Sequence, residues 1–138
     1  MRAESNIIPS ELYIEPLGNS VRLRFCVNVR ENEEDAELRY VYDEYTVEVA
    51  KRKGLEETVR ENIEKWSEFA RASEEKRFAD AVREKRGRLL SDSDWTQGAD
   101  SPLSEDRRRA WAEYRAELRD ITEQAGFPYS VTFPKKPV

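Results

Sequence analysis

The spacing of the apolar residues changes at Gly54, and this change constrains the fold more than any other feature of the sequence. From Val21 to Val29, apolar and polar side chains alternate, which is the period of a strand with one buried face. From Leu55 to Ala70, apolar residues recur every three or four positions, which is the period of an amphipathic helix. We therefore predict an α+β fold in which a sheet precedes the helices.

The N-terminal segment has the composition of an antiparallel sheet. Strand-like stretches at residues 11–15, 21–29 and 38–49 are separated by the turn residues Pro16–Asn19 and by an acidic loop at 30–37. Strands joined by such connections pair antiparallel. We expect an N-terminal antiparallel β-meander of about three strands, with one face covered by helix.

The stretch 38–49 carries apolar side chains on both of its faces. Tyr42 faces one way, whereas Val47 and Val49 face the other. This pattern predicts either a strand that is covered on both sides or a bulge near Asp43-Glu44 that changes the register.

Residues 55–88 have a helical period that fits either one long helix or two helices. The apolar stripe changes phase between Phe69 and Phe78. Ser73, which is followed by acidic residues, has the properties of an N-cap. These features favour two helices, or one helix with a kink.

The last helix is delimited by recognisable start and stop residues. Ser104 is a suitable N-cap, and Gly126 and Pro128 are suited to ending a helix. With the preceding helix, this segment predicts a C-terminal helical hairpin. We expect its core to consist of large apolar side chains from both helices: Leu89, Leu90, Trp95, Trp111, Tyr114 and Leu118.

The chain after Gly126 predicts an extended C-terminal arm. Apolar residues alternate between Tyr129 and Phe133, and Pro134 prevents regular structure beyond them. An arm flanked by prolines is not expected to close on itself, and it is suited to adding onto a sheet edge or groove of a partner. The predicted partner-binding residues are the apolar side chains of this arm: Phe127, Pro128, Tyr129, Val131, Phe133 and Pro134.

The N-terminal and C-terminal halves of the chain also differ in charge. Residues 1–70 contain 16 acidic and 10 basic side chains, whereas residues 71–138 contain 13 acidic and 14 basic ones. We expect two small domains, a sheet with an amphipathic helix at 1–72 and a helical region at 73–138. The acidic first half argues against a nucleic-acid partner.

The sequence also limits the expected environment of the chain. No apolar run reaches the roughly 18 residues of a membrane-spanning helix, so no membrane partner is expected. The N-terminus lacks the pattern of a signal peptide, and Cys26, the single cysteine, cannot form an internal disulfide. We expect a protein of a reducing compartment.

The residues that usually carry catalysis are missing from the sequence. There is no histidine, which is the commonest general base and metal ligand, and the five glycines are too isolated to form a phosphate loop. The acidic run between Glu31 and Glu37 lacks the order of a calcium loop and is expected to be solvated. We therefore expect no catalytic residue, no metal, no cofactor and no enzymatic activity.

The last third of the chain contains aromatic, proline and capping residues in a fixed order. The sequence reads D-W-T-Q at 94–97, D-S-P-L-S at 100–104, A-W-x-x-Y-R at 110–115 and G-F-P at 126–128, and it closes with F-P-K-K-P. In this order, residues 88–137 resemble the tail (fibre) assembly chaperones of bacteriophages and prophages. Phe133, where the family often has tryptophan, is a departure from the pattern.

The resemblance implies a non-catalytic chaperone in the host bacterial cytoplasm. Its implied partner is the tail fibre protein, bound at its C-terminal region, which it would help to fold, trimerise or attach. The front half of the chain carries no pattern that we assign to a family, and its sheet and amphipathic helix are expected to help recognise the fibre. Two alternatives stay open: a structural tail or baseplate component that is retained in the virion, and a phage-encoded inhibitor of a host protein.

Overall fold

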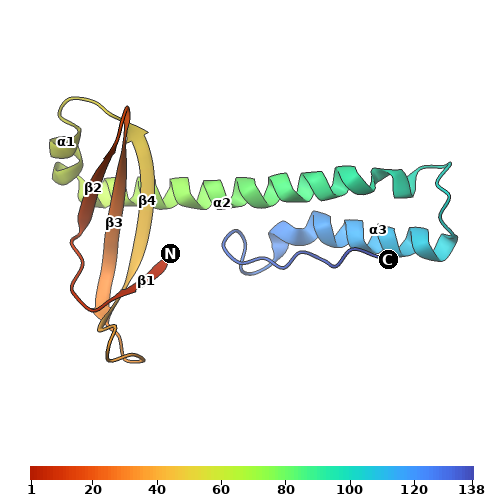
Figure 1. Cartoon of the computed structure of the whole chain (residues 1–138), viewed down its shortest axis with the longest axis horizontal. Helices are drawn as coiled ribbons and strands as arrows, with labels where there is room; N and C mark the ends of the chain where they lie inside the picture. The colour runs from red at the N-terminus through yellow and green to blue at the C-terminus, as the bar shows by residue number, and fades with distance from the viewer. The chain divides into compact units, whose positions relative to one another are not determined.

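The computed structural model describes residues 1–138, and the contacts between residues divide the chain into two compact units. Unit 1 contains Met1–Glu74, and unit 2 contains Glu75–Val138. The chain has the predicted α+β fold, with an antiparallel sheet followed by helices (Figure 1). That the chain comprises two domains meeting between residues 72 and 73 stays a prediction.

Four strands form the sheet of unit 1: β1 (Arg2–Ser5), β2 (Leu12–Leu17), β3 (Ser20–Glu31) and β4 (Tyr40–Ala50). Their order across the sheet is β1-β4-β3-β2, and all neighbouring strands are antiparallel. The strands β2, β3 and β4 form the predicted meander. The edge strand β1 was not predicted, because its sequence Arg-Ala-Glu-Ser has no apolar alternation.

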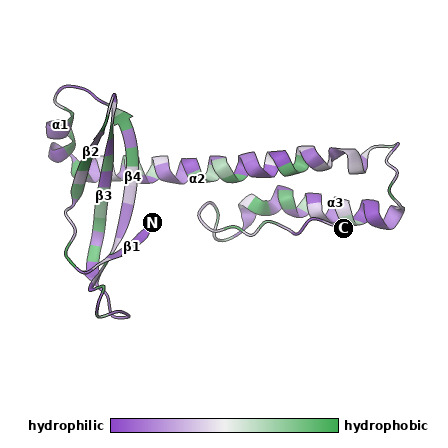
Figure 2. Cartoon of the chain, in the orientation of Figure 1, coloured by the Kyte–Doolittle hydropathy of each residue, from purple (hydrophilic) through white to green (hydrophobic).

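The core of unit 1 lies between one face of the sheet and the helices α1 (Leu55–Glu61) and α2 (Ile63–Ser93). Leu23 and Val47 are paired across β3 and β4, so both point to this face. Apolar residues recur along these strands in Figure 2. The buried members of the core are Leu12, Val21, Leu23, Phe25, Val47, Leu55, Val59 and Ala70.

The irregularity predicted in the sheet lies on β3 rather than in β4. The pairing with β4 shifts between Val27 and Arg30, where Asn28 has a φ of 55°. The Asn28 side chain donates a hydrogen bond to Asp43 Oδ2 at 2.9 Å, across from the shift. The alternation of β4 is preserved, and Tyr42 is buried on the face opposite the helices.

The helical segment is interrupted at Asn62, so the favoured arrangement of two helices meeting at Ser73 is wrong. The N–H of Asn62 donates to Val59 O, and the Asn62 backbone, at φ −139° and ψ 47°, leaves the helical region. From the next residue α2 runs without interruption through Ser73. Because α2 contains no proline and has supporting pairs such as Lys76–Asp80, nothing ends it at Ser73.

Unit 2 contains the predicted helical hairpin. The second half of α2 is followed by the short 3-10 helix η1 (Asp94–Gln97), a loop, α3 (Glu105–Arg119) and the 3-10 helix η2 (Asp120–Glu123). Ser104 caps α3, because its Oγ accepts a hydrogen bond from Arg107 N at 3.3 Å. No helix of the chain is both long and apolar enough to cross a membrane.

The core of unit 2 is built on the apolar stripe of α3. Its buried members are Trp111, Tyr114 and Leu118. Leu89 and Leu90 of α2 pack against them and are partly buried. Of the residues that the sequence assigns to this core, Trp95 is the one that the structure places differently.

Candidate partner-binding surfaces

The C-terminal arm begins with a tight turn at Gly126. Ser130 N donates a hydrogen bond to Gly126 O at 2.7 Å. A Cβ atom at position 126 would lie 2.2 Å from Ser130 O, so this close approach of the backbone requires glycine. The turn sends the arm back along α3 (Figure 1).

The side chain of Gln124 holds the arm to the end of η2. Gln124 Oε1 accepts a hydrogen bond from Thr132 N, and Gln124 Nε2 donates one to Thr132 O, both at 2.8 Å. The amide thereby satisfies a backbone donor and a backbone acceptor that a neighbouring strand would otherwise satisfy. Contrary to the expectation from the prolines, the arm closes on its own unit.

Two aromatic side chains of the arm contact α2. The ring centroid of Phe127 lies 5.5 Å from Arg83 Cζ, and the ring centroid of Tyr129 lies 5.1 Å from that of Phe78. Pro128, between them, is buried, whereas Tyr129 is 44% exposed. The contacts to α2 therefore leave part of the Tyr129 ring open to a partner.

Phe133 fixes the far part of the arm to the core of unit 2. Its ring packs against the cluster formed by Trp111, Tyr114 and Leu118, and it is partly buried. Lys85 Nζ lies 4.1 Å from the ring centroid of Phe133, which is cation–π geometry. Phe133 thus serves the fold of unit 2 itself.

Among the six side chains predicted to bind a partner, Tyr129 is the one that the structure leaves exposed. Pro128 is buried, and Phe127, Val131, Phe133 and Pro134 are partly buried. Any interface formed by the folded arm would therefore use Tyr129 together with the outer edges of its neighbours.

Trp95 lies at the edge of the hairpin core instead of inside it. Its side chain is 53% exposed, and its ring centroid lies 6.1 Å from that of Trp111. The next residue, Thr96, is fully buried in its place. The spacing of apolar residues does not predict that Thr96 is buried and Trp95 is exposed, because a shift of one residue in a short 3-10 turn decides which side chain faces inward.

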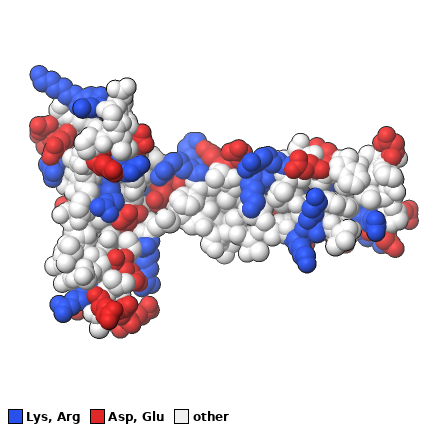
Figure 3. All heavy atoms as spheres, in the orientation of Figure 1, with Lys and Arg blue, Asp and Glu red and all other residues white.

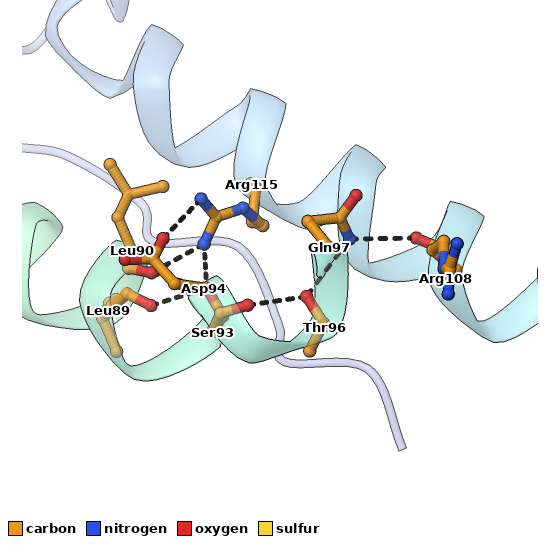
Figure 4. Close-up of polar contacts among 8 residues, drawn as sticks. All are labelled: Leu89, Leu90, Ser93, Asp94, Thr96, Gln97, Arg108 and Arg115. Atoms are coloured by element: carbon orange, nitrogen blue, oxygen red, sulfur yellow. Dashed lines mark hydrogen bonds and ion pairs between the residues drawn. The ribbon is translucent and has the colours of Figure 1, made fainter. Parts of the chain in front are cut away.

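A buried arginine, which the sequence analysis did not single out, holds the turn that carries Trp95. Arg115 of α3 is 8% exposed, and its Nη1 donates to Leu90 O at 2.6 Å and to Ser93 Oγ at 2.7 Å. Its Nη2 pairs with Asp94 Oδ1 at 2.7 Å (Figure 4). Arg115 is the last residue of the A-W-x-x-Y-R pattern at 110–115, but the pattern gave it no structural role.

Further hydrogen bonds fix the two residues that follow Trp95. Thr96 Oγ1 donates to Ser93 O at 2.6 Å. Gln97 Nε2 donates to Thr96 Oγ1 at 3.1 Å and to Arg108 O at 3.2 Å (Figure 4). These bonds connect the end of α2, the turn η1 and the first turn of α3.

Unit 1 carries an aromatic pair of its own, formed by the exposed Phe69 and the partly buried Trp66. Phe69 is 49% exposed, and its ring meets the Trp66 ring edge to face with 5.9 Å between the centroids. The pair lines a shallow hollow together with Thr58, Asn62 and Lys65. Exposed aromatic side chains of this kind are typical of contact surfaces.

The sheet face opposite the helices contains the buried thiol of Cys26. Burial raises the pKa of Cys26, Glu44 raises it further and Arg24 opposes the shift. Burial also raises the pKa of Tyr42. A raised pKa keeps the thiol protonated, which is opposite to the activation that a nucleophile needs. No group of three or more Asp, Glu, His or Cys side chains is placed to hold a metal ion.

Comparison with known families gives a match for the C-terminal part of the chain. The sequence model of the family described as phage tail assembly chaperone protein matches residues 79–138, which confirms the resemblance seen at 88–137. Searches of curated proteins and of solved structures found no match. The matched region contains the hairpin turn held by Arg115 and the folded arm, and it lies within unit 2. Residues 79–138 of this chain are therefore similar to the phage tail assembly chaperone family.

Proposed function

We propose that this chain is an assembly chaperone for a tail fibre protein, which it binds in the host cytoplasm without catalysing a reaction. The observation that carries the proposal is the family match over residues 79–138, because an assembly chaperone acts by binding a tail protein. The proposed client site is the C-terminal region of the fibre. The proposed effect is help in folding, trimerisation or attachment.

The folded arm supplies the first proposed contact surface for the fibre. Tyr129 is exposed, and its neighbours hold it in place, since Pro128 is buried and Phe127 packs under Arg83. A side chain that is already ordered loses little conformational entropy on binding. An exposed, ordered tyrosine is therefore a suitable contact residue.

Unit 1 is proposed to contribute recognition of the particular fibre. It lies outside the residues matched by the family, so the features shared by tail assembly chaperones reside elsewhere in the chain. Its exposed Phe69, which packs on the partly buried Trp66, offers an apolar contact separate from those of unit 2.

Complex formation with the purified fibre protein of the same phage tests this proposal. We expect the full-length chain to co-elute with the fibre in size-exclusion chromatography, and Tyr129→Ala to weaken binding about tenfold by loss of an aromatic contact. Glu113→Ala, at an exposed position of α3, is the matched control and should bind like the wild type. A Tyr129→Ala variant that binds as tightly as this control would remove the arm from the interface.

The protein content of purified virions separates a chaperone from a structural component. A chaperone leaves the assembled tail, so we expect the chain to be absent or substoichiometric when virions are analysed by quantitative mass spectrometry. A stoichiometric amount in the virion would contradict the proposed role and support a tail or baseplate component.

A further inference from the structure

The connecting end of the hairpin in unit 2 combines an exposed tryptophan with a strongly acidic surface. We propose that this end, called the acidic tip and comprising residues 89–106, is a second docking surface. It binds a basic segment of the tail protein client, with Trp95 entering an apolar pocket of that segment. The inference rests on the proposed function for the existence of a client, and it adds a contact site and the chemistry of the partner.

Trp95 is exposed although Ser93 and Thr96, which flank it in the same turn, are buried. Ser93 and Thr96 are 2% and 0% exposed, whereas Trp95, between them in sequence, is 53% exposed. The contact with Trp111 uses only part of the indole. An exposed indole contributes little to folding, because the hydrophobic gain depends on the area removed from water.

The backbone around Trp95 is held on both sides. Before it, Arg115 bonds Leu90 O and the side chains of Ser93 and Asp94. After it, Gln97 connects the turn to α3. These contacts, drawn in Figure 4, hold the backbone on both sides of Trp95 before any partner arrives, which lowers the entropic cost of binding.

The residues of the acidic tip carry an excess of acidic side chains. Arg109 and Arg115 of α3 pair with Asp106 and Asp94, and Arg108 Nη2 donates to Ser101 O. Asp92, Asp100 and Glu105 remain outside these ion pairs. Residues 89–106 contain five acidic side chains and no basic one, whereas the rest of unit 2 contains 7 acidic and 13 basic side chains. Figure 3 shows Asp and Glu side chains at this end of the hairpin, with Lys or Arg side chains beside them. The acidic side chains of the tip are Asp92, Asp94, Asp100, Glu105 and Asp106.

This charge selects the chemistry of the partner. Asp94 pairs with Arg115 and Asp106 pairs with Arg109, but the two carboxylate side chains stay 66% and 95% exposed. A basic segment would complement these carboxylates and be drawn to them over about 10 Å at moderate salt. A tryptophan at the centre of such a surface is a typical binding hot spot.

Isothermal titration calorimetry with the purified fibre protein tests the acidic tip. The fibre protein used is the one that forms a complex with the full-length chain. We expect Trp95→Ala to weaken binding at least about tenfold, with Trp95→Phe retaining part of the affinity. Asp92→Lys with Asp100→Lys should weaken binding to a similar degree, and raised salt should reduce the wild-type affinity more than that of this variant. The control is Glu113→Lys with Glu117→Lys, which makes the same charge change at exposed positions of α3.

The outcomes distinguish this inference from the proposed function. If Tyr129→Ala weakens binding and all tip variants bind like the wild type, the acidic tip is not a docking surface although the chaperone role stands. If the wild type does not bind the fibre at all, both proposals fall. If Trp95→Ala leaves the affinity for the fibre unchanged but alters the oligomeric state of the chain in the absence of fibre, the tip binds a second copy. The proposed client contact is then wrong. Circular dichroism verifies that each variant folds. If Trp95→Ala does not fold, the affinities of the charge variants and their control test whether the acidic tip binds the client.

Discussion

At Arg115, a guanidinium is buried in a small hairpin core. Removing such a charge from water costs several kcal/mol, and hydrogen bonds must offset that cost. Arg115 makes three, to Leu90 O, Ser93 Oγ and Asp94 Oδ1, while its Nε has no partner. Because Asp94 is largely exposed, the bonds to Leu90 and Ser93 are the better shielded from solvent.

Replacing Arg115 tests whether these bonds stabilise unit 2. Arg115→Ala removes three charge-assisted hydrogen bonds, while Ser93 Oγ still donates to Leu89 O and Leu90 O. We expect the free energy of unfolding to fall by about 2–4 kcal/mol. Arg115→Lys should retain part of the stability, because an ammonium reaches fewer acceptors. Urea denaturation followed by circular dichroism measures both changes.

Arg109 provides the matched control for this measurement. Its pair with Asp106 is solvent-exposed, with 69% and 95% of the two side chains accessible. Arg109→Ala should therefore cost less than about 0.5 kcal/mol. If Arg115→Ala destabilises the protein no more than Arg109→Ala, the Arg115 contacts do not hold the hairpin.

Cys26 gives a pH-dependent prediction in unit 1. Burial raises its pKa above the ordinary 9.0, so the folded state retains a proton that the unfolded chain loses at alkaline pH. Its contribution to stability is therefore complete below pH 9 and is lost as the pH rises through the folded pKa. At neutral pH we expect the thiol to react with an aromatic disulfide reagent at least about tenfold more slowly than in denaturant. Equal rates would show that Cys26 is accessible in the folded protein.

At the scale of elements, the C-terminal arm is a part of the hairpin fold. Its turn requires Gly126, Gln124 takes the place of a strand neighbour, and Phe133 completes the core. Removing the whole arm would therefore expose the core as well as any contact surface. Point substitutions at exposed positions such as Tyr129 separate the two effects.

Gly126→Ala tests the closed arm directly. The new methyl group would approach Ser130 O to 2.2 Å, so the turn must open. We expect faster hydrogen exchange at Ser130 N and Thr132 N, whose acceptors are Gly126 O and Gln124 Oε1. Gly87→Ala serves as the control, because no atom lies within 4 Å of an added Cβ there. Unchanged exchange at both amides would contradict the closed arm.

The elements that sequence predicted best are those with long, regular patterns. The strand β3 and the capped helix α3 each repeat one period over many residues. β1, the break at Asn62 and the exposure of Trp95 each depend on one to four residues. Such short features are set by tertiary contacts, for example the pairing of β1 with β4, which no local period reports.

The candidate site was predictable in location and not in detail. The order of aromatic and proline residues pointed to the last third of the chain, where the family match lies. The closure of the arm depends on the Gln124 amide, and the position of Trp95 depends on the buried Arg115. Neither polar side chain stands out in a pattern of hydrophobic residues.

At the scale of the whole molecule, the two units carry different charge and different surfaces. Unit 1 holds the sheet and the Trp66–Phe69 pair, and unit 2 holds the exposed Tyr129 and the acidic tip. Contacts on more than one surface would let one chain hold a client at several points, which raises the effective affinity. Such a client-holding role is the central claim of the proposed function.

The most direct test of this claim is the yield of soluble, trimeric fibre when the fibre gene is expressed with and without this chain. We predict more trimer, resolved by native gel electrophoresis, with the wild type, and a smaller gain with a variant that combines Tyr129→Ala and Trp95→Ala. The Glu113→Ala variant should act like the wild type, since its exposed site lies outside the proposed surfaces. An equal trimer yield with and without the chain would contradict the account.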